Sequence, residues 1–201
     1  NILKKIDTKN KIIFKSHRII LDDNTCKYIF FIRDPVSRYV SGFISRLRKG
    51  KPLYYLEWSN DEKQSFNLFK TPNELAEALS SLDKNIKESA FKSMKTILQL
   101  RQDISYYLKN IENLKKIKDN ILYIGRKETI NKDIENIIKL LEYDYEIDDN
   151  DNNSKFKHKT PNEYKELEYL SELAKQNIIK YYEKDYEIIN YLISNNMISK
   201  V

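Results

Sequence analysis

The chain has 201 residues, a formal net charge of +6 and a single cysteine, Cys26. This length suits one domain with a hydrophobic core, with or without a helical annex. One cysteine excludes a disulfide framework and a cysteine zinc site within the chain, and no apolar run approaches membrane-spanning length. The excess of basic residues is compatible with nucleotides, acidic glycans or nucleic acid as partners. No signal peptide is visible, so we expect a cytoplasmic protein.

Short apolar runs predict strands at Lys11–Phe14, Tyr28–Ile32 and Asn120–Gly125. Such runs are typical of interior strands in a parallel sheet. Helical periodicity predicts helices from Pro35 to about Gly50, from Pro72, from Ile86 to Lys116 with one break, from Ile130, and from Leu170. Alternating strands and helices indicate an α/β fold with a helical C-terminal part, in a single domain over residues 1–201.

Two Thr-Pro-Asn-Glu tetrapeptides, Thr71–Glu74 and Thr160–Glu163, carry the pattern of a capping box with proline at the first helical position. We predict a helix start at each of them. The stretch Leu53–Lys70 shows no helical pattern and predicts an irregular segment, either a loop packed on the core or a lid. The polar run Asp148–Ser154 lacks the glycine and the glutamate of an EF-hand, so we expect disorder there.

The segment around Arg33 is the most informative part of the chain. An apolar strand leads into Arg33, and Asp34 and Pro35 then open a helix that carries Ser41. Asp is a favoured N-cap, and Pro suits the first helical position because its fixed φ is helical. An arginine at a strand end, beside a helix start with a hydroxyl and free amides, predicts an anion site. A surface salt bridge of Arg33 beside a plain helix start is the alternative.

The register of this helix supports the anion site. Its apolar residues recur at helical spacing and form one stripe: Val36, Val40, Phe43, Ile44 and Leu47. Its polar residues follow at steps of three and four on another face: Arg38, Ser41, Ser45 and Arg48. Arg33 and Ser41 can therefore meet at one dianionic group while the apolar stripe packs on a sheet.

Lys15-Ser16-His17 directly follows the first predicted strand. If that strand is parallel to the next, both carboxyl ends lie at one sheet edge, where open α/β sheets bind ligands. Lys15 and His17 would then lie near Arg33. Lysine suits charge that builds on a transferred oxyanion, and histidine, with a pKa of about 6.5, can accept a hydroxyl proton near neutral pH. A satisfied turn residue is the alternative for His17.

The pattern Arg-Asp-Pro-x-x-Arg-x-x-Ser after an apolar strand resembles the 3′-phosphate-binding element of sulfotransferases. These enzymes use 3′-phosphoadenosine 5′-phosphosulfate (PAPS) as sulfuryl donor. The resemblance implies a P-loop-like parallel sheet flanked by helices, with Arg33 and Ser41 on the 3′-phosphate of the donor. Lys15-Ser16-His17 is similar to the Lys-Thr/Ser-His segment of the cytosolic members. That likeness implies that His17 is the catalytic base and that Lys15 contacts the sulfuryl group.

Two later segments resemble the same group. Gly125-Arg126-Lys127-Glu128 is similar to the Gly-Arg-x-Glu segment of membrane-type and bacterial carbohydrate sulfotransferases. Cytosolic relatives have a tyrosine near the adenine at the place of Lys127, and we interpret Glu128 as structural because a helix start favours an acidic residue. The C-terminal run resembles the closing helices of the group, which end in Tyr-x-x-Asp-x-x-Ile. A basic loop there closes over the cofactor in related enzymes, and Lys159 is its candidate here; a solvated loop lysine is the alternative.

The family's 5′-phosphosulfate loop, a turn like Pro-Lys-x-Gly-Thr, has no counterpart in the chain. The three glycines, Gly42, Gly50 and Gly125, all lie outside such a loop. In the family this loop precedes the Lys-x-His strand. We therefore expect either an N-terminal strand and loop upstream of Asn1 or a degenerate relative. If these residues are the whole protein, we expect no catalysis and weak PAPS affinity.

The sequence thus predicts a PAPS-dependent sulfotransferase that needs no metal and acts on an acceptor hydroxyl. A carbohydrate acceptor is expected because the closer resemblance is to glycan sulfotransferases. Tyr54, Tyr55 and Trp58 either stack on sugar rings or pack in the core. The alternatives are an enzyme like a P-loop nucleotide kinase and a basic, non-catalytic module for nucleotides or nucleic acid. Nucleic acid ranks last because no recognised motif for it is present.

Overall fold

The computed structural model describes residues 27–143 and 160–198. They form a mixed α/β structure that is mostly helical, with one two-stranded parallel sheet. Contacts group the chain into two compact units. Of the described residues, the first unit comprises 27–33, 107–143 and 191–198, and the second comprises 34–106 and 160–190. The single domain expected over residues 1–201 stays a prediction.

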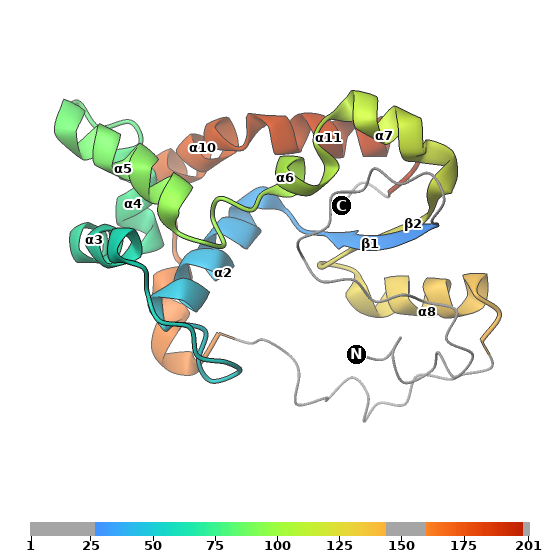
Figure 1. Cartoon of the computed structure of the whole chain (residues 1–201), viewed down its shortest axis with the longest axis horizontal. Helices are drawn as coiled ribbons and strands as arrows, with labels where there is room; N and C mark the ends of the chain where they lie inside the picture. Colours follow the sequence, from blue (N-terminus) through green and yellow to red (C-terminus); the bar gives the residue numbers. More distant parts are fainter. Residues whose placement is uncertain (1–26, 144–159, 199–201) are drawn as a thin grey trace. The chain divides into compact units, whose positions relative to one another are not determined.

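The strands and α-helices are labelled in Figure 1. Strands and helices follow in the order β1 (Tyr28–Ile32), α2 (Pro35–Leu47), α3 (Asn60–Leu68), α4 (Pro72–Ala78), α5 (Lys84–Thr96), α6 (Ile104–Leu108), α7 (Ile111–Ile117), η1 (Lys118–Asn120), β2 (Ile121–Arg126), α8 (Ile130–Leu140), η2 (Asn162–Glu168), α10 (Glu172–Tyr181) and α11 (Glu183–Ser194). The elements η1 and η2 are 3₁₀ helices.

The parallel pairing of β1 with β2 confirms the predicted strand direction. The strand at Tyr28–Ile32 has the predicted bounds, and β2 starts one residue later than expected. In the register of the sheet, Ile32 lies beside Arg126. The N–H of Lys127 then donates to the carbonyl of Ile32 at 2.9 Å. The carboxyl ends of the two strands therefore meet at one edge, while the strand predicted at Lys11–Phe14 lies outside the described residues.

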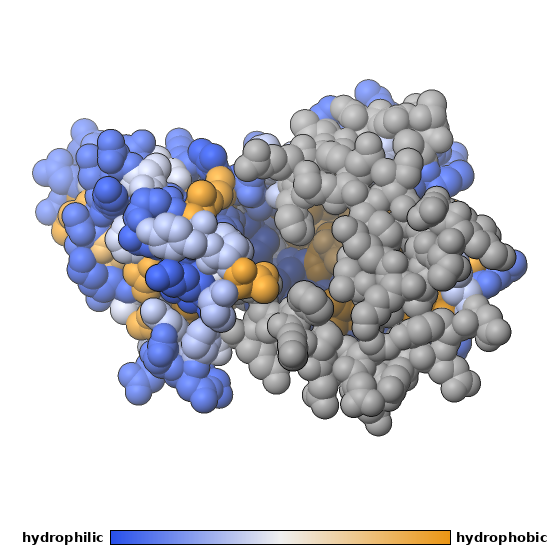
Figure 2. Space-filling model, turned by 60° about the horizontal axis from the view of Figure 1, so that its bottom comes forward, coloured by the Kyte–Doolittle hydropathy of each residue, from blue (hydrophilic) through white to orange (hydrophobic). Residues whose placement is uncertain are grey.

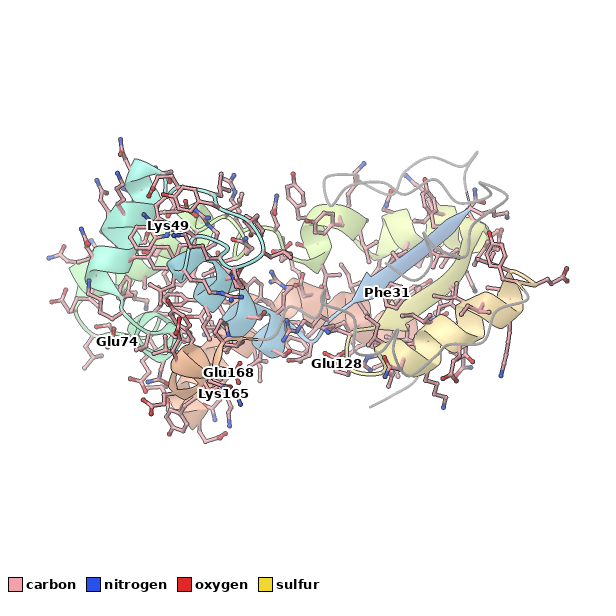
Figure 3. The ribbon with its side chains drawn as sticks, turned by 90° about the horizontal axis from the view of Figure 1, so that it is seen from below. Phe31, Lys49, Glu74, Glu128, Lys165 and Glu168 are labelled. Carbon is pink, nitrogen blue, oxygen red and sulfur yellow. The ribbon has the colours of Figure 1, made fainter. Side chains whose placement is uncertain are left out.

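Gly125 permits a close side-chain contact within this sheet. The ring of Phe31, labelled on β1 in Figure 3, lies so near that a Cβ at position 125 would come within 2.3 Å of a ring carbon. A glycine is therefore required for this placement of the ring. A small apolar cluster on α8, built on Ile137 and Ile138, packs with Ile29 of β1 in the same unit.

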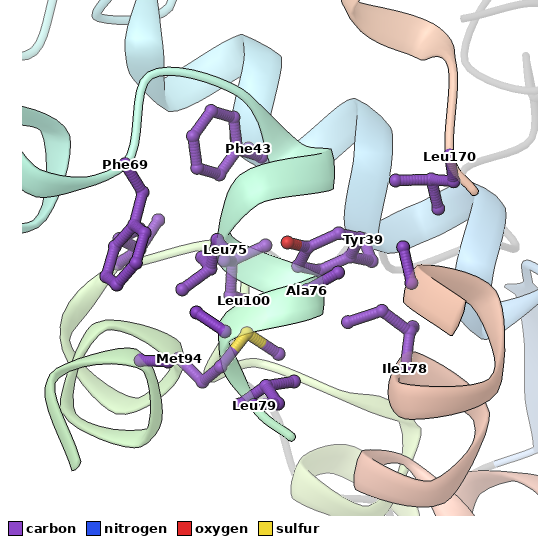
Figure 4. Packing of buried hydrophobic residues seen from close by; sticks show 14 of the residues in the cluster. Tyr39, Phe43, Phe69, Leu75, Ala76, Leu79, Met94, Leu100, Leu170 and Ile178 are labelled. Atoms are coloured by element: carbon purple, nitrogen blue, oxygen red, sulfur yellow. The ribbon is translucent and has the colours of Figure 1, made fainter. Parts of the chain in front are cut away.

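The second unit has a larger hydrophobic core, built where α2, α4, α5 and α10 pack together (Figure 4). Its fully buried members include Tyr39, Phe43, Leu75, Ala90, Met94, Leu100 and Ile178. The Tyr39 hydroxyl donates to the carbonyl of Pro72 at 2.6 Å, so its polar atom is satisfied inside the core. The apolar stripe predicted for α2 is confirmed in part. Phe43 and Ile44 are buried, whereas Val36, Val40 and Leu47 are only partly covered.

A buried ion pair links the end of α2 to α3. The Arg46 guanidinium donates to both carboxylate oxygens of Glu62, at 2.7 and 2.6 Å, and Arg46 is fully buried. It also donates to the carbonyls of Leu56 and Glu57. Burial alone would raise the pKa of Glu62, but the hydrogen bonds from Arg46 and from backbone amides outweigh it, so the pKa is lowered. Glu62 is therefore an ionised carboxylate, and both of its oxygens accept hydrogen bonds.

The irregular segment predicted at Leu53–Lys70 is wrong for its second half, which forms α3. Ser59 caps this helix by accepting from the Glu62 N–H at 3.2 Å, and Glu62 accepts from the Ser59 N–H at 3.0 Å. This Ser-x-x-Glu spacing is a capping box that the sequence displays. The first half, through Glu57, has no regular structure.

Two further helix predictions need correction. The pattern from Ile86 to Lys116 is broken twice, between α5 and α6 and between α6 and α7. Thr71 forms its predicted capping box with Glu74, with the Glu74 N–H 3.0 Å from the threonine hydroxyl. The box predicted at Thr160–Glu163 does not form, because the first turn of η2 closes through its backbone, with the Tyr164 N–H on the carbonyl of Pro161.

On the face shown in Figure 2, the described residues are mainly hydrophilic, with hydrophobic ones in small groups. In residues 27–143 and 160–198, no helix has the length and apolar character needed to cross a membrane.

Candidate functional site

The start of α2 is built as the sequence predicts. Asp34 is the N-cap, and its Oδ1 accepts from the Ser37 N–H at 2.7 Å. Pro35 stands at the first helical position, where a missing N–H costs nothing. Arg33 lies between the end of β1 and this cap, and it is partly buried.

A residue of α11 completes this helix start. The Tyr186 hydroxyl donates to Oδ2 of Asp34 at 3.1 Å, across 152 positions of sequence. The Val36 N–H also hydrogen-bonds to the Tyr186 oxygen. Burial raises the pKa of Tyr186 well above its ordinary value, and the neighbouring Asp34 carboxylate raises it further. The phenol therefore stays protonated and acts as a donor.

These contacts correct the expectation that the helix start offers free amides. Pro35 has no N–H, and the N–H groups of Val36 and Ser37 are taken by Tyr186 and Asp34. The Arg38 N–H bonds to the carbonyl of Asp34 at 2.8 Å. An anion at this place would therefore be held by side chains, because the first-turn amides are already satisfied.

Ser41 lies in the second turn of α2 and is partly buried. Among the residues that the structure describes, its hydroxyl forms no side-chain hydrogen bond. The hydroxyl is thus able to donate to a ligand without breaking an internal contact.

Arg38, the second arginine of the motif, has a structural role. Its Nη1 donates to the carbonyls of Gln99 and Gln102, both at 3.1 Å. The guanidinium lies over the ring of Tyr182, 4.5 Å from the centroid, and its Nη2 is 3.8 Å from a carboxylate oxygen of Asp185. These contacts link α2 to the segment that follows α5. The Arg38 side chain is therefore held by contacts inside the fold.

Asp185, the carboxylate that lies near Arg38, is itself buried. It accepts from the N–H of Ile104 at 3.0 Å and of Ser105 at 2.9 Å, the first amides of α6. Burial raises the pKa of Asp185 to about 6, and the negative charge of Asp103 adds to the rise. Tyr182 and Asp185 are the first two positions of the C-terminal Tyr-x-x-Asp-x-x-Ile pattern, so this pattern serves the packing of the second unit.

This raised pKa predicts a pH-dependent stability. The folded protein binds the proton of Asp185 more tightly than the unfolded chain does, so the free energy of unfolding should rise as the pH falls. The expected rise is about 1 kcal/mol between pH 7 and pH 5. Urea unfolding across this range should show the rise in the wild type, and Asp185→Asn should remove it. Asp61→Asn, at an exposed position on α3, is the matched control; an Asp185→Asn variant that keeps the rise would contradict the assignment.

A second carboxylate organises the end of β2. Oδ2 of Asp133 accepts from the Arg126 N–H at 2.8 Å and from the Thr129 hydroxyl at 2.7 Å. Oδ1 accepts from the Tyr123 hydroxyl at 2.8 Å. Burial opposes ionisation, but these hydrogen bonds outweigh it and lower the pKa of Asp133. Asp133 therefore holds the turn after β2, and the ion pair of Arg126 with Glu128, at 3.7 Å, agrees with a structural Glu128.

The comparisons with known proteins place these elements in a family. A family model described as the sulfotransferase family matches residues 4–192. The chain belongs to the sulfotransferase family. No curated protein and no solved structure gives a significant match. The predicted family is confirmed, and the family match makes this protein an enzyme of sulfuryl transfer.

Three of the five site residues predicted for this sulfotransferase lie outside the described residues: Lys15, His17 and Lys159. Their roles stay predictions. Arg33 and Ser41 are described, at the end of β1 and within α2, and they belong to different compact units. Their joint action on a phosphate also stays a prediction. Among the described residues, no group of three or more His, Cys, Asp or Glu side chains could hold a metal ion.

Sequence reasoning missed the residues that support the motif of this sulfotransferase. Tyr186 and Gln99 carry no local signal, because their partners lie far away in the sequence. Trp58 is settled as a packing residue: its ring lies 4.8 Å from that of Phe66, and its N–H donates to the carbonyl of Arg46 at 2.6 Å. Tyr54 and Tyr55 are exposed, by 40% and 57%. The core packing expected as their alternative is therefore wrong for these two.

Proposed function

We propose that the protein transfers a sulfuryl group from PAPS to a hydroxyl of a carbohydrate acceptor. The observation that carries this proposal is the family match over residues 4–192, together with the Arg33–Ser41 segment that it contains. In the described structure this segment is a strand end, a capped helix start and a hydroxyl without an internal side-chain partner.

The donor set suits a phosphate. A guanidinium offers several N–H groups in a planar fork that matches phosphate oxygens, and a hydroxyl adds one further donor. We assign Arg33 and Ser41 to the 3′-phosphate of the donor and Lys159 to a further phosphate contact. Because Asp34 and Tyr186 occupy the first-turn amides of α2, recognition in this proposal depends on side chains.

The chemistry of the proposal uses two residues near the first predicted strand. PAPS, when bound, supplies an activated sulfuryl group with a phosphate leaving group. His17 takes the proton of the acceptor hydroxyl, and Lys15 stabilises the charge on the sulfuryl oxygens and on the leaving phosphate. Anchoring the 3′-phosphate orients the donor for in-line attack.

Exposed aromatic side chains support a carbohydrate acceptor. Tyr54 and Tyr55 are exposed residues in the segment after α2, although the Tyr54 ring lies against Gly50 and its hydroxyl accepts from the Gln99 side chain at 2.9 Å. The ammonium groups of Lys49 and Lys51 lie over the Tyr55 ring, 5.9 and 5.2 Å from its centroid. Flat rings of this kind stack on the apolar faces of sugars, and Lys51 suits an acidic glycan. Lys49 already forms an ion pair with Glu57 at 2.6 Å.

The reaction itself can be measured with the full-length protein and PAPS that carries a labelled sulfur, offered with an acidic polysaccharide. Label should pass to the polysaccharide, and His17→Ala should slow the transfer by about 10²- to 10⁴-fold. His158→Ala, at the only other histidine, is the matched control. Transfer of phosphate from ATP without any transfer from PAPS would instead support the kinase-like alternative and contradict the proposal.

A further inference from the structure

The contact between Tyr186 and Asp34 joins the closing helices to the motif of the proposed donor site. Asp34 uses one carboxylate oxygen to cap α2 and the other to accept from Tyr186. The tyrosine oxygen in turn takes the Val36 N–H. The Tyr186 side chain of α11 therefore contacts both the N-cap of α2 and the first N–H group of that helix. Ser41 lies on the same helix, and Arg33 directly precedes its N-cap in the chain.

We propose that Tyr186 is a positioning residue for donor binding. Its hydroxyl holds the Asp34 carboxylate in place, and so holds the backbone from which Arg33 and the first turns of α2 extend. Tyr186 itself touches no substrate in this proposal. The inference rests on the proposed function, because it assigns Tyr186 to the support of the 3′-phosphate site.

The geometry separates this role from a role in folding. If the hydroxyl is removed, Asp34 still caps α2 through the Ser37 N–H, and Pro35 still starts the helix. The core of the second unit lacks Tyr186 among its buried members, so its packing is retained. What is lost is the constraint on the Asp34 side chain and on the Val36 peptide. The expected consequence is a less organised phosphate site on an intact fold.

The test compares two nucleotides on the full-length protein by calorimetry: 3′,5′-adenosine bisphosphate and adenosine 5′-monophosphate. Tyr186→Phe should bind the bisphosphate about five- to ten-fold more weakly than the wild type, which is the net worth of a typical intramolecular hydrogen bond. Its affinity for the monophosphate should not change. Tyr181→Phe is the matched control, because the Tyr181 hydroxyl has no hydrogen-bond partner among the described residues.

Asp34→Ser provides a second variant, which keeps an oxygen that can cap the helix but has no second oxygen to accept from Tyr186. It should reproduce the loss of Tyr186→Phe, and the double variant should lose little more, since both changes break one contact. Equal weakening of the binding of both nucleotides, or unchanged bisphosphate affinity in Tyr186→Phe and Asp34→Ser, would overturn the positioning role. A wild-type protein without preference for the bisphosphate would overturn the donor proposal itself, and the positioning role with it.

Discussion

Replacing Arg46 with methionine is expected to lower the free energy of unfolding by about 3–5 kcal/mol. The variant leaves the Glu62 carboxylate buried without its cation, and it deprives the carbonyls of Leu56 and Glu57 of a donor. Glu62 keeps its hydrogen bonds from the N–H groups of Ser59 and Leu98, which cannot neutralise its charge. Urea unfolding monitored by circular dichroism measures this loss.

Two further variants test the cause. Arg46→Met combined with Glu62→Leu removes both charges and should recover the part of the loss that comes from the unpaired carboxylate. The recovery should be incomplete, because the backbone groups that the pair satisfied lose these hydrogen bonds. Lys92→Met breaks the exposed ion pair with Asp61, at 3.4 Å, and should cost less than about 1 kcal/mol. An Arg46→Met variant within about 1 kcal/mol of the wild type would contradict the importance of the buried pair.

The sequence predicts well what is decided locally. Asp34 and Pro35 determine the start of α2 with their own side chains, and Thr71 does the same for α4. The apolar run Tyr28–Ile32 needs no distant partner to be recognised as a strand. Ser59 and Glu62 show the same local chemistry, and α3 could have been predicted from their spacing.

What depends on distant partners could not be predicted. α2 and its C-cap carry Arg38, Arg46 and Arg48, and nothing in their spacing reveals that Arg46 is fully buried. That outcome depends on Glu62, which the chain brings back sixteen positions later. The sequence predicts Arg38 on a polar face, but its partners are the carbonyls after α5 and a carboxylate of α11.

In the candidate site, too, the local pattern is predicted and the contacts between distant residues are not. The order of its motifs predicts the family, which the comparison confirms. The expectation of free amides at the start of α2 is wrong, because Tyr186, 152 positions away in the sequence, occupies one of them. A local motif therefore predicts the helix start better than it predicts the distant side chains that complete it.

The central claim is that Arg33 recognises the 3′-phosphate of the donor. The most direct test is calorimetry of the wild type and Arg33→Ala, each with 3′,5′-adenosine bisphosphate and with adenosine 5′-monophosphate. Arg101→Ala, which removes an exposed arginine, controls for the loss of charge. The wild type should prefer the bisphosphate, and Arg33→Ala should lose about 10- to 100-fold in affinity for it, with the monophosphate unchanged. A bisphosphate affinity that Arg33→Ala leaves intact would contradict the claim.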